Sequence, residues 1–385
     1  MNTPLADGPA RLLWGAAALA ACNDAATENA AYWRGLLAAG PQSLVGNYHV
    51  RAGLLVHDGR AWPLTLGHRP SAEAYPASLH SHYVRYPKAE LHLVPSPLLR
   101  RAARAGFTLF DGLTRLARID RTVQWSSWLL STNLHPPDIA ATSPEITATL
   151  VRFFPAYAVL VRNLHDYLDP HLSSRFDSVG YHLLAARRIY LFDGRTPDFL
   201  SRYNVKTDAK ALRRLASHRL VTVDDITEAD APRITELYRL LYLEKHSQLN
   251  PAYNLHFVRQ ALRERWFDFR GLRHESGRLD AVCGSFHAHG TATTPFFGYD
   301  TTLPPSLGLY RLLVAHLLED TAASRRVLNY SSGAGAFKRH RGAIPVLEYN
   351  ALFTRHLPPL QRTAHALLRL FINGPGRRFL ENTDV

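Results

Sequence analysis

Short apolar runs and amphipathic runs alternate along the whole chain. Apolar residues in alternation, or in continuous runs bounded by turn residues, predict strands, and apolar residues three and four apart predict helices. Asp58-Gly59 predicts a hairpin turn, and Ser96-Pro97 predicts a helix start. Strands are expected at 46–57, 61–66, 81–94, 122–130, 156–163, 187–192, 268–273, 279–288, 292–299, 326–332 and 345–353. Helices are expected at 96–117, 143–153, 227–246, 254–266, 306–322, 335–341 and 361–372.

Both halves of the chain mix strands with helices, which predicts an α+β fold. Thr227 with Asp230 three residues later is a near capping box at the start of the helix 227–246. The length of 385 residues and the apolar content of 46% exclude a disordered chain and allow two packed cores. The segment 194–204 is the expected joint, which predicts domains at 1–204 and 205–385.

Cysteine usage and the N-terminal segment bear on the compartment. Cys22 and Cys283 are too few for a disulfide framework, so we expect a reduced, cytoplasmic protein. No run reaches the ~18 apolar residues of a membrane span, so no membrane association is expected. The segment 12–22 ends like a lipoprotein cleavage site, but Asp7 and a single Arg11 precede it where a signal requires net positive charge. A helix is the favoured interpretation, and a lipoprotein signal is the alternative.

The charge of the chain is strongly positive. Lys and Arg number 45 against 32 Asp and Glu, a formal net charge of +13. Only five of the basic residues are lysine, so part of the excess reflects codon usage. The charge favours polyanionic partners such as the phosphates of CoA or RNA, and it does not indicate DNA. Arginine patches, which are either solvated faces or contacts to an RNA-borne donor, occur at Arg100, Arg101, Arg104, Arg115, Arg118 and Arg121, and again at Arg202, Lys206, Lys210, Arg213 and Arg214.

A predicted helix start lies just after the strand that ends at 297–300. Ser306, Leu307, Gly308, Leu309 and Tyr310 open a helix that follows a Pro-Pro turn. Free backbone N–H groups at a helix start bind anions, and a glycine permits close approach. The segment is therefore a candidate phosphate site. The alternative is that its glycine serves only the packing of the helix on the sheet.

A basic segment follows the next predicted strand. The chain has five basic residues and no acidic residue between 321 and 347. Gly333 and Gly335 form neither a Walker loop nor a dinucleotide fingerprint. Lys338 and Arg341 are three positions apart, so both can face one anion from a short helix. The alternative is a solvated basic helix.

These pieces together resemble a known superfamily. The strand ending Phe-Gly-Tyr-Asp at 297–300, the Leu-Gly-x-Tyr start at 307–310 and the Phe-Lys to Gly segment at 337–342 resemble the C-terminal half of a GNAT acyltransferase. More narrowly they resemble the FemAB-like and CelD-like branch. The resemblance covers about 205–355 and is weaker over 1–204. It implies two GNAT-like domains, each a mixed β-sheet flanked by helices, with a degenerate first domain.

One departure from the superfamily concerns its pyrophosphate loop. That loop usually begins with Gln or Arg and ends with Gly or Ala, where this chain has Pro305 and Tyr310. FemAB-type enzymes, which use aminoacyl-tRNA, also lack a strict loop. The resemblance therefore implies N-acyl or N-aminoacyl transfer to a small-molecule amine, with acyl-CoA or aminoacyl-tRNA as co-substrate and no tightly bound cofactor. tRNA is a partner in the second case. The alternatives are a lipid N-acyltransferase, and a non-catalytic RNA- or protein-binding module on the same fold.

Acyl transfer needs a base for the amine, a donor to the oxyanion and an acid for the leaving group. Glu244, His246 and His287 are candidate bases, and Tyr299 is a candidate proton donor at the strand end. His287 and His289 share a strand face, where they are core or surface residues, substrate contacts or a metal pair. No third metal ligand is near in sequence, so no metal site is expected. The candidate catalytic residues are therefore Glu244, His287 and Tyr299, the candidate substrate-binding residues are Asp300, Tyr330, Ser331 and Ser332, and the candidate donor-binding residues are Ser306, Leu307, Gly308, Leu309, Tyr310, Lys338 and Arg341. The resemblance implies that the segment of Lys338 borders the cleft, whereas Arg341 follows from its spacing alone.

Overall fold

The computed structural model describes residues 5–6, 10–24, 29–67, 73–93 and 96–382, which form two compact units. Unit 1 contains the described residues up to Arg187 together with Leu249–Pro251 and Leu347–Asn382. Unit 2 contains Arg188–Gln248 and Ala252–Val346. The units thus divide the chain differently from the expected domains 1–204 and 205–385. The division falls within two strands, β7 (His182–Asp193) and β13 (Ile344–Phe353).

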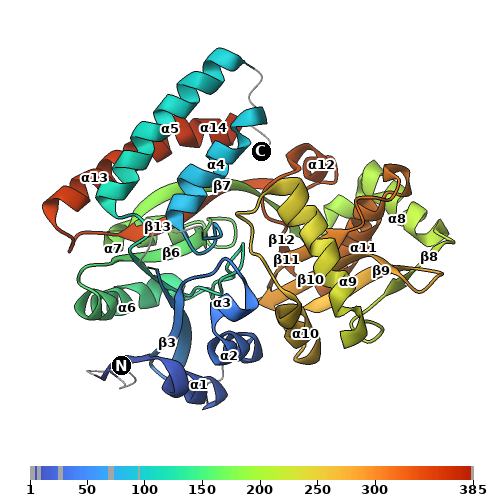
Figure 1. Cartoon of the computed structure of the whole chain (residues 1–385), viewed down its shortest axis with the longest axis horizontal. Helices are drawn as coiled ribbons and strands as arrows, with labels where there is room; N and C mark the ends of the chain where they lie inside the picture. Colours follow the sequence, from blue (N-terminus) through green and yellow to red (C-terminus); the bar gives the residue numbers. More distant parts are fainter. Residues whose placement is uncertain (1–4, 7–9, 25–28, 68–72, 94–95, 383–385) are drawn as a thin grey trace. The chain divides into compact units, whose positions relative to one another are not determined.

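The elements of unit 1 are mainly strands and long helices (Figure 1). Its strands are β1 (Leu5–Ala6), β2 (Ala10–Leu13), β3 (Arg51–His57), β4 (Arg60–Leu66), β5 (Thr122–Trp125), β6 (Ala158–Leu164) and parts of β7 and β13. Its helices are α1 (Gly15–Asp24), α2 (Ala30–Ala39), α3 (Pro41–Leu44), α4 (Tyr86–Ala89), α5 (Pro97–Ala117), α6 (Ile139–Phe153), α7 (Leu172–Val179), α13 (Pro359–Phe371) and α14 (Arg377–Asn382).

Unit 2 has a similar composition. Its strands are β8 (His218–Val221), β9 (Asp268–His274), β10 (Leu279–Ala288), β11 (Thr291–Tyr299), β12 (Val327–Asn329) and the remaining parts of β7 and β13. Its helices are α8 (Tyr203–Arg214), α9 (Ala231–Tyr238), the π-helical segment Arg239–His246, α10 (Leu255–Arg263), α11 (Leu309–Ser324) and α12 (Gly335–Arg339).

The two units repeat one strand order. In unit 1, β2 to β5 are antiparallel neighbours, β6 is parallel to β5 across helix α6, and β13 is antiparallel to β6. In unit 2, β8 to β11 are antiparallel neighbours, β12 is parallel to β11 across helix α11, and β7 is antiparallel to β12. The last strand of the unit 1 series is β13, which lies in the second half of the sequence. The last strand of the unit 2 series is β7, which lies almost wholly in the first half. The expected α+β fold with mixed sheets is confirmed, and the assignment of both units as GNAT domains stays a prediction.

The sheet of unit 1 is buried on both faces. Along β6, Val159 and Val161 pack in a cluster with Leu150 of α6, whereas Leu160 packs in a second cluster with Leu368 of α13. Side chains that alternate in this way give the continuous apolar run that the sequence shows at 156–163. Figure 1 shows α5 and α13 lying side by side, and both helices contribute residues to the second cluster.

Helices also cover both faces of the sheet in unit 2. Helix α11, with α8 beside it, packs against β9 and β10, and α9 packs against β10 and β11 with α10 beside it. The expected capping box is confirmed, because Thr227 and Asp230 exchange their side-chain and backbone hydrogen bonds. Gly298 of β11 lies so close to the backbone of Leu237 that any side chain there would collide with it.

Two N-terminal expectations differ from the structure. The predicted strand 81–94 is wrong, because the chain forms a π-helical turn at Ser81–Arg85 followed by helical turns. Leu79 and Tyr83 pack in one cluster, a spacing of four that suits a helical face. The helix expected within 12–22 begins later, as α1 after strand β2. Among the described residues, no helix has the length and apolarity needed to cross a membrane.

Candidate functional site

The parallel strands β11 and β12 stay together for only a short distance. Their pairing runs from Thr291 opposite Val327 to Thr293 opposite Asn329 and then ends. β11 continues to Tyr299, and its next residues include Pro295, which has no N–H to donate. β10 has a bulge at the same level, and bulges bend the strands that carry them. The pairing of the two strands therefore ends, and we call the place beyond Thr293 of β11 and Asn329 of β12 the unit 2 opening.

Tyrosine side chains gather at this opening. The hydroxyl of Tyr330, one residue beyond β12, donates to the hydroxyl oxygen of Tyr310 in the first turn of α11 at 3.2 Å. Rings of Phe297, Tyr299 and Phe337 have their centroids 5.1, 6.1 and 5.0 Å from the ring of Tyr310. Burial raises the pKa of Tyr310 and raises the pKa of Tyr330 well above its ordinary value. Both hydroxyls therefore remain protonated and can donate hydrogen bonds.

A lysine lies beside the third tyrosine. The ammonium of Lys245, in the π-helical segment, donates to the hydroxyl oxygen of Tyr299 at 2.8 Å and lies 5.4 Å from the centroid of its ring. Sequence reasoning missed Lys245, although it stands next to the candidate base Glu244. The sequence signal that could have indicated Lys245 is its residue type, because the chain has only five lysines and this one stands near a helix end. The pair places a positive charge against a hydroxyl that can transfer a proton.

A helix starts close to the expected position after β11, and its role as an anion site stays a prediction. Gly308 is the N-cap residue, with a φ of 66° and no side-chain cap. Ser306 and Leu307 belong to a 3-10 turn before it, so α11 itself begins later than expected. First-turn N–H groups of a helix lack acceptors within the helix. Leu309 and Tyr310 carry such N–H groups, and the side chain of Leu309 is buried in the core.

Lys338 and Arg341 do not form the anion site that their spacing suggested. The buried ammonium of Lys338 donates to the carbonyl oxygens of Tyr330, Ser331 and Ser332 at 2.6, 3.2 and 2.9 Å. The guanidinium of Arg341 donates from Nε and Nη2 to the buried carboxylate of Asp208 at 2.9 and 2.6 Å. The segment has no acidic residue near in sequence, but a distant acid and a strand end supply the acceptors. The interpretation as a solvated basic helix is also wrong for Lys338 and Arg341, because both side chains are buried and bind acceptors within the protein.

The three expected catalytic residues do not meet. Glu244 is exposed and pairs with Arg239 of its own helix. His287 lies opposite Ala292 at the far end of β10 from the position that pairs with Tyr299. Burial lowers the pKa of His287, and its Nε2 lies 3.9 Å from a carboxylate oxygen of Asp268. Only Tyr299 of this trio lies at the unit 2 opening, because antiparallel strands separate residues that sequence analogy had grouped.

The expected substrate-binding residues also differ in where they lie, since some are at the unit 2 opening and others serve the fold. Asp300 accepts from Arg233 at 2.6 Å and from the backbone N–H of Thr302 at 2.9 Å, so it stabilises the turn after β11. The backbone of Ser331 pairs with β7, because its carbonyl accepts from Tyr190. Tyr330 lies at the opening. Substrate contacts by the Ser331 and Ser332 hydroxyls stay a prediction.

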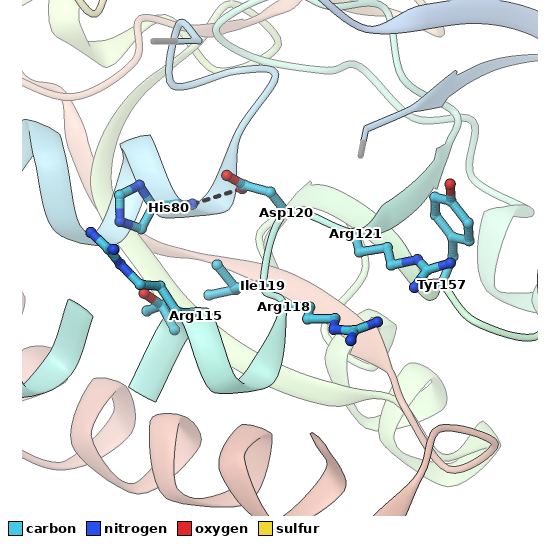
Figure 2. Close-up of a pocket in the computed structure, with 8 residues that line it drawn as sticks. His80, Arg115, Arg118, Ile119, Asp120, Arg121 and Tyr157 are labelled. Carbon is cyan, nitrogen blue, oxygen red and sulfur yellow. Dashed lines mark hydrogen bonds between the residues drawn. The ribbon is translucent and has the colours of Figure 1, made fainter. Parts of the chain in front are cut away.

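Unit 1 has an open pocket at the end of α5, with a volume of about 420 Å³ (Figure 2). Arg121 lies over the ring of Tyr157 with 4.8 Å to the centroid, and Arg115 pairs with Asp111 at 2.8 Å. The same carboxylate lies 2.6 Å from the ring of His80. Three residues of the expected arginine patch therefore line this pocket, and Arg100, Arg101 and Arg104 do not. The lining residues are His80, Thr114, Arg115, Arg118, Ile119, Asp120, Arg121 and Tyr157.

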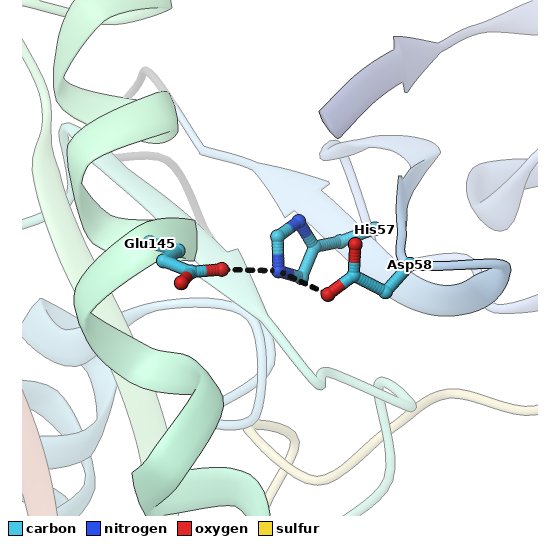
Figure 3. Close-up of side chains that lie close together, drawn as sticks. All are labelled: His57, Asp58 and Glu145. Carbon is cyan, nitrogen blue, oxygen red and sulfur yellow. Dashed lines mark ion pairs between the residues drawn. The ribbon is translucent and has the colours of Figure 1, made fainter. Parts of the chain in front are cut away.

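A second cluster in unit 1 has ligand types that metals use (Figure 3). Nε2 of the buried His57 lies 2.7 Å from a carboxylate oxygen of Glu145 and 3.3 Å from one of Asp58. The shorter distance is that of a hydrogen bond, and both carboxylates are exposed. The contacts are those of a hairpin end held to α6, and the expectation of no metal stays a prediction.

No family model and no curated protein matches this chain. Solved structures that match include L-PGS from Bacillus licheniformis, with 12% identity, a TM-score of 0.43 and coverage of 60% of this chain and 79% of that chain. FemX matches with 7% identity, a TM-score of 0.44 and coverage of 58% and 77%. A tandem GNAT protein from the clavulanic acid biosynthesis pathway matches with 14% identity, a TM-score of 0.38 and coverage of 87% and 92%. At these values the likeness is distant and does not establish an activity.

Proposed function

We propose that this chain transfers an acyl or aminoacyl group to the amine of a small molecule, at the unit 2 opening. One observation carries the proposal. The pairing of the parallel strands β11 and β12 ends after three residue pairs, and beyond it Tyr310, in the first turn of the uncapped helix α11, lies with its ring centroid 6.1 Å from that of Tyr299. Such a place combines backbone donors for an anionic donor molecule with side-chain donors for its reacting carbonyl.

The chemistry follows from these groups. The phosphates of the donor bind the first-turn N–H groups of α11. The amine attacks the donor carbonyl, a C–N bond forms, and the C–S bond of a thioester or the C–O bond of an aminoacyl ester breaks. The hydroxyl of Tyr310 donates to the carbonyl oxygen as it gains negative charge.

Proton transfer completes the balance. Tyr299 gives its hydroxyl proton to the leaving thiolate or alkoxide, and the attacking amine returns a proton to the phenolate. The ammonium of Lys245, 2.8 Å from the Tyr299 oxygen, stabilises the negative charge on that oxygen between the two transfers. General acid–base steps of this kind contribute about 10²–10⁴-fold in rate.

The test is turnover with three donors: acetyl-CoA, a long-chain acyl-CoA and bulk aminoacyl-tRNA, each with a panel of small amines. Release of CoA thiol, or loss of the aminoacyl ester, should occur with one donor class. Tyr299→Phe should reduce kcat at least 100-fold while leaving the melting temperature nearly unchanged. The matched control is Tyr203→Phe at an exposed position of α8. A donor that stabilises the fold without being consumed would replace the proposal with the non-catalytic binding module.

A further inference from the structure

Two buried arginines lie together in unit 1. Arg162 of β6 is 3% exposed and Arg187 of β7 is 8% exposed. Their charges repel, and this repulsion adds to burial in lowering the pKa of Arg162. Two guanidinium groups in a protein interior require anionic partners, because an unpaired buried charge is costly.

One of the two arginines has a carboxylate. Arg187 donates from Nε and Nη2 to the fully buried Glu348 at 2.7 and 3.2 Å. Asn163 donates to the same carboxylate at 2.8 Å. This carboxylate is therefore committed to Arg187 and Asn163.

Within the part of the chain that the structure describes, the other arginine has no carboxylate within hydrogen-bond distance. Arg162 donates from Nη1 to the carbonyl oxygen of Pro76, and its Nε has no acceptor among the described residues. The neighbouring His82 is neutral, because burial and the two arginines lower its pKa well below its ordinary value. Arg162 and Arg187 carry two positive charges and Glu348 carries one negative charge, which leaves these three residues with a surplus of one positive charge.

The surplus lies where a ligand would be expected from the repeated strand order. β5 and β6 are parallel and pair through three residue pairs, the last being Gln124 opposite Leu160. Arg162 follows that pair by two residues. In unit 2 the pairing of β11 and β12 also ends after three pairs, next to Tyr330. The corresponding point of unit 1 is thus charged, whereas that of unit 2 is aromatic.

We propose that unit 1 binds a small molecule through a single carboxylate group, which pairs with Arg162 beside Arg187. One negative charge matches the surplus, and a planar carboxylate accepts two parallel hydrogen bonds from a guanidinium. The residues of this site are not those assigned to acyl transfer in unit 2. Its existence does not depend on the proposed reaction.

The first experiment measures the melting temperature of dialysed, ligand-free variants. Arg162→Met removes an unpaired charge and should leave the melting temperature unchanged or raise it. Arg187→Met strands the carboxylate of Glu348 and should lower it by at least 5 °C. Arg175→Met, at a surface pair, is the control. If Arg162→Met lowers the melting temperature as far as Arg187→Met, the guanidinium is structural and the proposal is wrong.

The second experiment compares acids with their amides at 10 mM. The pairs are glycine and glycinamide, leucine and leucinamide, and benzoate and benzamide, with inorganic phosphate alongside. At least one acid should raise the melting temperature of the full chain by 2 °C or more, its amide should not, and Arg162→Met should abolish the shift. Equal effects of acid and amide, or no shift with any acid, would overturn the proposal. A shift with phosphate alone that Arg162→Met abolishes would overturn the carboxylate assignment.

Discussion

The ammonium of Lys338 lies 2.6 Å from the carbonyl oxygen of Tyr330 and 4.7 Å from the centroid of its ring. One side chain thus caps the strand end and packs on the aromatic ring at the unit 2 opening. The carbonyls of Ser331 and Ser332 also accept from it, so one ammonium donates to three successive backbone acceptors. A lysine that sequence spacing assigned to ligand binding is, in the fold, the residue that positions Tyr330.

Replacement of this lysine should destabilise unit 2. Lys338→Met removes the donor of the Tyr330 and Ser332 carbonyl oxygens, whereas the Ser331 carbonyl keeps the N–H of Tyr190, and each charge-assisted bond contributes about 1.5–3 kcal/mol. With some access of water to the vacated site, we expect a loss of about 2–4 kcal/mol in the free energy of unfolding. Urea denaturation measures it, with Lys210→Met at an exposed position of α8 as the control. A variant within 0.5 kcal/mol of the wild type would contradict the capping role.

The Arg341–Asp208 pair should couple strongly. Both side chains are buried, so removal of either partner leaves a buried charge and should cost about 3–5 kcal/mol. A double-mutant cycle with Arg341→Met and Asp208→Asn should give a coupling free energy of about 2 kcal/mol or more. The control cycle uses Arg213 and Glu319, an exposed pair at 3.0 Å, for which about 0–1 kcal/mol is expected. Equal coupling free energies in the two cycles would show that burial does not strengthen the interaction of Arg341 with Asp208.

Local patterns predicted most elements of unit 2 because burial there follows sequence periodicity. The strand expected at 279–288 has those bounds in the structure, since its run is apolar and ends at turn residues. The exchange of β7 and β13 between the two series of strands could not be predicted in this way. The paired residues of these strands are more than 100 positions apart in the sequence. Such distant pairing leaves no periodic signal in either strand.

The candidate site was predictable only in part. The tyrosines at 299, 310 and 330 lie together, because a strand end, a helix start and the next strand end meet in this topology. The roles of Lys338 and Arg341 were not predictable, since their acceptors are a strand end and the distant Asp208. The arginines of unit 1 did leave a signal. Arg162 interrupts an apolar run, and a charge inside a buried strand indicates a partner or a ligand.

Gly308 should show a conformational cost when replaced. At a φ of 66°, an added Cβ costs about 1–2 kcal/mol, and it would also meet the side chain of Arg311. Gly308→Ala should therefore lower the free energy of unfolding by about that amount and raise the donor Km. Gly112→Ala, in helix α5 with open space around the Cβ position, should instead stabilise by about 0.5–1 kcal/mol. A stable Gly308→Ala variant with unchanged donor Km would remove this helix start from the proposed site.

His365 should make the stability of unit 1 depend on pH. Burial lowers the pKa of this α13 side chain from 6.5 to about 4, against a smaller opposing effect of the Ala117 carbonyl. Because the unfolded chain binds the proton more readily, the contribution of the neutral imidazole to stability is present above pH 6.5 and is lost as the pH falls toward 4. The shift corresponds to about 3 kcal/mol.

The measurement compares the wild type with His365→Leu by urea denaturation at pH 7.5, 5.5 and 4.5. Other buried histidines, such as His82 and His165, also have lowered pKa values and destabilise both proteins as the pH falls. The difference between the two proteins isolates one imidazole. It should move in favour of the variant by about 2–3 kcal/mol between pH 7.5 and 4.5, because leucine has no proton to bind. A difference that stays constant over this range would mean that His365 takes up its proton in the folded state as readily as in the unfolded chain, and so that its burial carries no cost.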